Sequence, residues 1–119
     1  MEGYKAVTKY VRMSPRKGAI VADLIRGKSC EEAKAILKFS PKKPAKHILK
    51  TLKSAIANAI DRSNGELDVM DLVVNHVSVN QGPSMKRLKP RARGSADIIK
   101  RKTSHINVTV AEKKEEIAN

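Results

Sequence analysis

The chain has 119 residues, a length suited to a single domain with one modest core. Its 25 lysines and arginines outnumber its 12 aspartates and glutamates, and the resulting net charge of +13 indicates a polyanionic partner, most often nucleic acid. A lone cysteine excludes a disulfide framework, and the absence of a signal peptide or of an apolar run near the ~20 residues of a membrane span predicts a cytoplasmic protein with no membrane partner.

The first predicted elements are a short strand over residues 4–11 and a helix that follows it. The stretch "YKAVTKYV" alternates between two sets of side chains, as a strand does. Ser14 fits an N-cap, Pro15 the first helical position and Gly27 the left-handed position after the last turn. The apolar stripe expected for this helix consists of Ile20, Val21, Leu24 and Ile25.

Two further helices are predicted before the middle of the chain. Ser29 and Glu32 have the spacing of a capping box, and Ala33, Ile36 and Leu37 follow as the apolar face of the second helix. The third helix is expected to begin at Pro44 and to end near Asn64 and Gly65. Its apolar side is formed by Ile48, Leu49, Leu52, Ala55, Ile56, Ala59 and Ile60.

The rest of the chain has the pattern of strands. Residues 69–81 are rich in β-branched side chains, and in residues 104–110 Ile106, Val108 and Val110 alternate with polar residues. Together the elements predict an α+β fold, in which a small three-stranded antiparallel sheet packs against three helices and the last two of these strands pair.

The segment between those strands concentrates the charge. From Pro83 to Thr103 it holds eight basic residues and one acid, Asp97. A loop of about twenty residues is uncommon in a compact domain, so a continued two-stranded ribbon is the favoured interpretation. Ten residues each way would project on the order of 30 Å. We therefore expect one domain with a globular body at about 1–82 and 104–112, a basic β-hairpin arm at about 83–103, and a charged tail at 113–119.

Basic residues also gather on two of the predicted helices. In the third helix they recur at intervals of three and four, which places them on one face without an interleaved acid. At the first helix they precede or open the first turn, where an anion would offset their conflict with the helix dipole. The alternative for each group is a solvated face. The candidate phosphate-binding residues on the two helices are Arg12, Arg16, Lys17, Lys42, Lys43, Lys46, Lys50 and Lys53, with His47 beside the last set.

Enzymatic and metal chemistry have little support in the sequence. His47, His76 and His105 are far apart and have no second cysteine or HExxH spacing beside them, so no metal or cofactor is expected. The alternative roles of these imidazoles are surface exposure or RNA contact. The helix start would lower the pKa of Cys30 somewhat, but no base is paired with it, so we interpret it as a small helix residue. We predict that the protein is not an enzyme.

The mode of binding is constrained by aromatic content. Tyr4, Tyr10 and Phe39 are the only aromatic residues, too few for a base-stacking platform, so shape and phosphate geometry should dominate. A DNA-architectural protein with a basic β-arm is the alternative, although "RARGSA" offers no apolar wedge. A binder of anionic membranes is a third candidate, which the core-like apolar face of the third helix disfavours.

Four blocks of sequence carry a resemblance to a known family. They are "VRMSPRKGAIVADLIRGK", "EEAKAILKFSPKKPA", "LKSAIANA" and "NQGPSMKRLKPRARGSADIIKRKTSHINVTV". In order, spacing and length they resemble the bacterial ribosomal protein L22 family (universal family uL22), over essentially the whole chain. Two positions depart from the pattern of many relatives: Ser95 stands where a base is frequent, and Lys89 where an apolar residue is frequent.

The resemblance implies a structural, rRNA-binding protein of the large ribosomal subunit that supports early assembly and is a monomer within the ribosome. It implies a β-hairpin threading through 23S rRNA, whose tip lines the nascent-peptide exit tunnel beside ribosomal protein L4, near the macrolide site, with the nascent peptide as a further partner. The strands of the hairpin would be Gly82 to Pro90 and Ile98 to His105. The tip would consist of Arg91, Ala92, Arg93, Gly94, Ser95 and Ala96. The other RNA-binding residues of the hairpin would be Lys86, Arg87, Lys89, Lys100, Arg101, Lys102 and His105.

Overall fold

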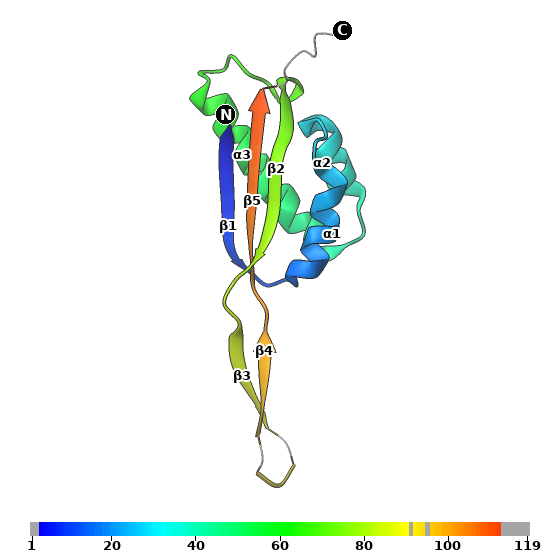
Figure 1. The fold of residues 1–119 in the computed structure, drawn as a ribbon, viewed down its shortest axis with the longest axis vertical. Coiled ribbons are helices and arrows are strands. Elements are labelled where there is room, and N and C mark those ends of the chain that lie inside the picture. Colours follow the sequence, from blue (N-terminus) through cyan, green and yellow to red (C-terminus); the bar gives the residue numbers. More distant parts are fainter. Residues whose placement is uncertain (1–2, 91, 95, 113–119) are drawn as a thin grey trace.

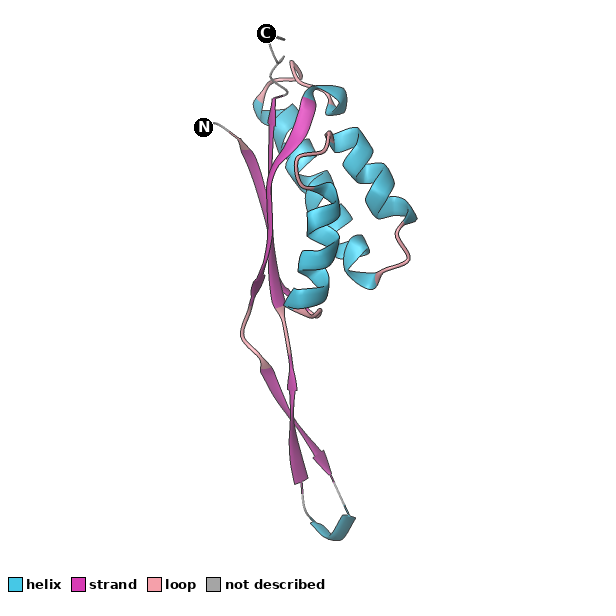
Figure 2. Cartoon of the chain, turned by 45° about the vertical axis from the view of Figure 1, so that its right-hand side comes forward, coloured by secondary structure: helices cyan, strands magenta, loops and turns pink. Residues whose placement is uncertain are grey.

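The computed structural model describes residues 3–90, 92–94 and 96–112, and in this part of the chain the predicted α+β fold is confirmed. Three strands form an antiparallel sheet in the order β1-β5-β2: β1 (Tyr4–Val11), β2 (Leu72–Gln81) and β5 (Ser104–Glu112). Three helices cover one face of this sheet (Figures 1 and 2): α1 (Pro15–Ile25), α2 (Cys30–Phe39) and α3 (Lys43–Arg62). The core lies between these two layers.

β1 occupies its predicted range, but a bulge interrupts its alternation. Ala6 is buried, and the Thr8 hydroxyl shares a 2.8 Å hydrogen bond with that of Thr51 on α3. The register with β5 then shifts between Thr8 and Val11, and Tyr10 adopts a positive φ of 58°. Tyr10 is therefore exposed and Val11 buried, whereas strict alternation would have placed Tyr10 on the side of Ala6 and Thr8.

α1 begins and ends as predicted, but its buried stripe differs from the prediction. Its buried residues are Gly18, Val21, Ala22 and Ile25, whereas Ile20 and Leu24 are nearly half exposed. The cause is the contact with β2: a Cβ built on Gly18 would lie 2.9 Å from Cγ1 of Val79. α1 therefore turns its glycine, rather than its largest apolar side chains, toward the sheet.

α2 and α3 follow the predicted pattern closely. The Ser29 hydroxyl accepts a 3.3 Å hydrogen bond from the backbone N–H of Glu32, which caps α2. α3 begins at Lys43, one residue before the predicted start, and its chain turns away through Asn64 and Gly65, both with positive φ. The apolar side of α3 is buried except for Leu49, which is half-buried, and Ile60, which lies at the border of exposure.

The predicted pairing of the last two strands of the sheet is confirmed, with a later start. β2 begins at Leu72, because Val69–Asp71 forms a 3₁₀ turn capped by Asp68. β5 is the central strand, and Ile106, Val108 and Val110 are fully buried against the helices.

Between β2 and β5 the chain forms the predicted ribbon. β3 (Met85–Pro90) and β4 (Ala96–Arg101) pair in a two-stranded sheet of their own, from Met85 opposite Arg101 to Pro90 opposite Ala96. A 3₁₀ turn, Ala92–Gly94, lies at the far end, and Gly94 has the predicted positive φ, 73°. The ribbon prolongs the sheet beyond the helices, and the molecule measures 70 × 25 × 23 Å (Figure 1). The predicted tail, residues 113–119, lies outside the described residues.

Candidate nucleic-acid interface

The lysines of α3 lie opposite its buried side. At 100° per residue, positions 46, 50 and 53 fall about half a turn from the buried stripe centred on Ile48, Leu52 and Ala55. Lys42, Lys43, Lys46, His47, Lys50 and Lys53 are all exposed. Among the described residues the only ion pair joins Arg26 to Asp23, so these lysines form a cationic row without neutralising carboxylates. We call Lys42, Lys46, Lys50 and Lys53 the α3 row.

The second predicted group surrounds the start of α1. Arg12, Arg16 and Lys17 are exposed, and the first turn of the helix holds no acid. Ser14 occupies the N-cap position, but its side chain makes no capping hydrogen bond. The first N–H groups of α1 thus add to the positive potential of the three side chains.

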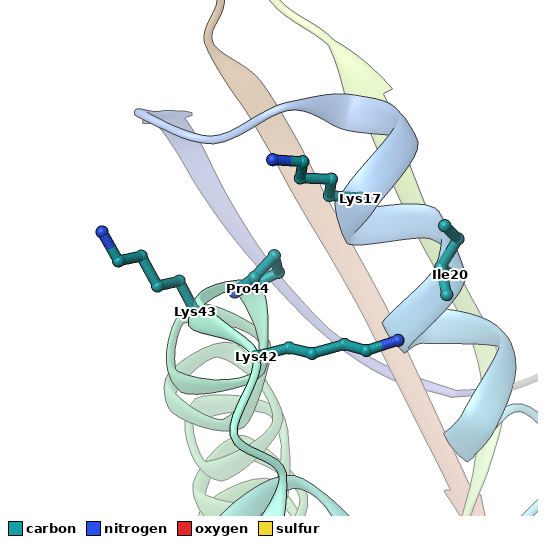
Figure 3. A pocket seen from close by; sticks show the side chains of 5 residues that line it. All are labelled: Lys17, Ile20, Lys42, Lys43 and Pro44. Atoms are coloured by element: carbon teal, nitrogen blue, oxygen red, sulfur yellow. The ribbon is translucent and has the colours of Figure 1, made fainter.

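The structure brings these two groups together at one place. A hollow of about 370 Å³ lies between α1 and the start of α3, and it is lined by Lys17, Ile20, Lys42, Lys43 and Pro44. Figure 3 shows the side chain of Lys42 extending toward α1 and that of Lys17 extending toward the side of α3. Two clusters that are separate in sequence therefore form one cationic surface.

The arm carries the third predicted group. Lys86 and Lys102 are exposed, as are Pro90, Ala92 and Gly94. In the register of the ribbon, Lys86 stands opposite Lys100, and like charges at directly opposed positions destabilise a strand pair. The other basic positions within β3, the tip turn and β4 are Arg87, Lys89, Arg93 and Arg101, while the predicted tip residues Arg91 and Ser95 lie outside the described residues.

The base of the arm is closely bonded to the sheet. The N–H of Gly82 donates to the carbonyl of Thr103 at 2.9 Å, and the Thr103 hydroxyl donates to the carbonyl of Pro83. The Ser104 hydroxyl donates to the carbonyl of Met13 at 2.8 Å. Thr103 and Ser104 are buried, so the β5 side of the junction between arm and body is both hydrogen-bonded and shielded from solvent.

His105 belongs to this junction. Its Nδ1 accepts a 3.1 Å hydrogen bond from the backbone N–H of Tyr10, and the two rings meet edge to face with their centroids 5.0 Å apart. The structure therefore uses one ring nitrogen of His105 within the protein. Contact of its remaining ring atoms with RNA stays a prediction.

The open face of the sheet supplies basic residues that the sequence analysis did not single out. Figure 2 shows the sheet edge-on, with the helices on one side only. On β1, Lys5, Val7 and Lys9 are exposed, in alternation with the half-buried Tyr4 and Thr8 and the buried Ala6. The exposure of Lys5 and Lys9 could have been predicted from the sequence, because the period of two in "YKAVTKYV" assigns both lysines to one face of the strand.

Cys30 is a buried core residue. Burial raises the pKa of its thiol to about 11, and Lys34 offsets only part of that effect. The lowering of this pKa by the helix start was wrong, because loss of hydration outweighs it. The interpretation of Cys30 as a small helix residue is confirmed by its buried position in α2. Within the described residues no group of three or more histidine, cysteine, aspartate or glutamate side chains could hold a metal ion.

The fold and its charges define a class: small, strongly basic α+β proteins in which a helix-covered sheet extends into a β-hairpin. None of the helices in the described part of the chain has the length and apolar character needed to cross a membrane. The chain belongs to the family described as Ribosomal protein L22p/L17e, whose sequence pattern matches residues 6–111.

Individual relatives agree with this assignment. The chain is 56% identical to the large ribosomal subunit protein uL22 of Desulforamulus reducens over 111 residues, which cover 93% of this chain and 96% of the relative. It is 59% identical to that of Heliobacterium modesticaldum over 109 residues, covering 92% and 76% of the two chains. It is 56% identical to that of Fusobacterium nucleatum over 108 residues, covering 91% and 96%. The resemblance drawn from the sequence is confirmed.

Proposed function

We propose that this protein is a structural constituent of the large ribosomal subunit in the cytoplasm and not an enzyme. Its membership of a ribosomal protein family and its net charge of +13 support this role. Its partner is 23S rRNA, to which it binds as a monomer through the α3 row, the start of α1 and the arm. Binding through both the body and the arm would connect separate RNA segments, which suits a protein that supports early subunit assembly.

The arm is the observation that carries this proposal. It is a two-stranded ribbon that pairs with itself beyond the helical layer, and a lone two-stranded hairpin is marginally stable in water. Its eight basic residues would add repulsion to an already weak element. Folded RNA supplies what is missing, because its phosphates neutralise the charge and its grooves confine the strands.

The family resemblance supports a specific location for the arm. In this proposal its tip, residues 91–96, lines the nascent-peptide exit tunnel near ribosomal protein L4 and the macrolide site, where a nascent peptide passes it. Of the tip, Ala92 and Gly94 are exposed small residues, which suits a narrow passage. The body at 1–82 and 104–112 then serves as the anchor from which the arm extends.

A competition experiment tests the proposal. The full-length protein is bound to 23S rRNA at moderate salt and challenged with random-sequence duplex DNA at equal phosphate concentration. Preference for the rRNA by a factor of about 10³ or more is expected of specific recognition. Equal affinity for both polymers would reject the ribosomal role and favour a DNA-architectural one.

A further inference from the structure

The hollow between α1 and α3 combines two kinds of lining. Its volume of about 370 Å³ is within the range of small-ligand sites. Ile20 and Pro44 give it an apolar surface, and Lys17, Lys42 and Lys43 add basic side chains to its lining. In Figure 3 the Lys42 side chain extends toward α1, whereas that of Lys43 extends away from it.

The apolar part of the hollow is partly exposed in the free protein. Ile20 is 49% exposed although it lies one residue from the fully buried Val21. It remains uncovered because α1 packs on β2 through Gly18, while Pro44 fills the other side of the hollow. A β-branched apolar side chain held at the mouth of a cationic hollow can pack against a flat ligand.

The charged part is not balanced within the described residues. Neither α1 nor α3 has an acid in its first turn, and the residues lining the hollow form no ion pair. Lys42 is the N-cap of α3 and provides no side-chain oxygen for the first N–H groups. The ends of two helix dipoles and three ammonium groups therefore favour an anion at this position.

We propose that this hollow binds a single nucleotide of RNA, with its phosphate among Lys17, Lys42 and Lys43 and its base or ribose against Ile20 and Pro44. This inference rests on the proposed RNA binding and adds a defined subsite to it. A nucleotide fits both linings, whereas a free phosphate would use only the lysines. A lipid surface would require a broad apolar helix face in place of a concave site.

The Ile20 methyl group provides a direct readout. Full-length protein with ¹³C-labelled isoleucine methyl groups is titrated with oligoadenylate of five nucleotides, and in parallel with pyrophosphate. We expect the Ile20 δ1 methyl signal to move upfield and to saturate with the oligonucleotide, because a base ring lies over it, and to move little with pyrophosphate. The exposed Ile60, near the other end of α3, is the internal control.

Charge variants test the lysines. The first triple variant combines Lys17→Gln, Lys42→Gln and Lys43→Gln. We expect it to raise the dissociation constant for the oligonucleotide, measured from the Ile20 methyl shift, about tenfold, because three phosphate contacts are lost. The control variant combines Lys28→Gln, Lys34→Gln and Lys38→Gln, which remove the same charge outside the candidate interface. We expect it to leave the dissociation constant unchanged. Ile20→Ala should weaken binding of the oligonucleotide but not of pyrophosphate.

Contrary outcomes are clear. Equal Ile20 shifts with pyrophosphate, equal loss in both triple variants, or no saturable shift would overturn the nucleotide site. A shift produced by anionic lipid vesicles and not by oligonucleotide would do the same. These results would reject the nucleotide site but not the proposed function. The proposed function is rejected only if the unmodified protein shows no preference for 23S rRNA over duplex DNA.

Discussion

The backbone N–H of Tyr10 donates a hydrogen bond to Nδ1 of His105 across 3.1 Å, and this contact joins the bulge of β1 to the start of β5. Tyr10 holds a positive φ of 58°, an unusual conformation for a residue with a Cβ. The imidazole and the edge-to-face ring contact help to maintain it.

Replacement of His105 should therefore weaken the body as well as the arm. We expect His105→Ala to lower the free energy of unfolding by about 1–2 kcal/mol, through the lost hydrogen bond and the lost ring contact. Urea denaturation followed by circular dichroism measures this. His76→Ala, an exposed histidine of β2, should change stability by less than about 0.5 kcal/mol. Similar losses in both variants would contradict a specific role for the Tyr10 contact.

The close packing of Gly18 on Val79 makes a second prediction. In an ordinary helix, Gly→Ala stabilises by about 1 kcal/mol. Here the added methyl group would lie 2.7 Å from Cε of Met13 and 2.9 Å from Cγ1 of Val79, so Gly18→Ala should instead destabilise by about 1 kcal/mol.

A double-mutant cycle checks the cause. In a Val79→Ala background only the flexible end of the Met13 side chain remains close to the methyl group, so Gly18→Ala should become neutral or stabilising. Ser54→Ala, on the exposed side of α3, serves as the reference for helix propensity alone. If the cost of Gly18→Ala is the same in both backgrounds, Val79 is not its source.

Removal of charge from the α3 row should change the salt dependence of RNA binding. For the combined variant Lys46→Gln, Lys50→Gln and Lys53→Gln, the log–log slope of affinity against salt should flatten by up to about three. Filter binding of 23S rRNA at several salt concentrations provides the slope. The triple variant at Lys28, Lys34 and Lys38 is the control, and an unchanged slope in the α3 variant would identify this face as merely solvated.

Shortening the arm should leave the body stable. β3 pairs only with β4 within its own sheet, so deletion of Met85, Lys86 and Arg87 removes pairing partners of the arm and not of the three-stranded sheet. We expect the melting temperature of the free protein to change by no more than about 2 °C, while affinity for 23S rRNA falls. A loss of 10 °C or more would show that the body depends on the arm.

The buried thiol of Cys30 predicts a pH dependence above neutrality. Its pKa is raised to about 11 in the folded chain, whereas in the unfolded chain it titrates near 8.5–9. The folded state therefore disfavours the thiolate, and the associated stability is complete below pH 8 and declines progressively between pH 9 and pH 11.

The comparison of wild type with Cys30→Ala isolates this effect from other titrating groups. Wild type should lose about 2–3 kcal/mol more than the variant between pH 8 and pH 11. Alkylation by iodoacetamide at pH 8 should also be slow until the protein unfolds. Parallel stability profiles would contradict a raised thiol pKa.

Local patterns in the sequence predicted most of the fold. Ser29 before Glu32 predicted the cap of α2, and Gly27 and Gly94 occupy the left-handed positions expected of them. These features depend on neighbouring residues alone, so the chain specifies them without its tertiary context. The family was also determined by sequence, because its motifs cover nearly the whole chain.

The tertiary structure decided which of the apolar residues on a helix are buried and which distant side chains become neighbours. Helical periodicity allowed Ile20 and Leu24 to be core residues, but the contact of Gly18 with β2 turned them outward. Likewise, no sequence pattern placed Lys17 beside Lys42, because that neighbourhood exists only after α1 and α3 have packed on one sheet. The hydrophobic pattern of a helix indicates only approximately which of its sides is buried. Packing against the sheet decides which individual residues are buried.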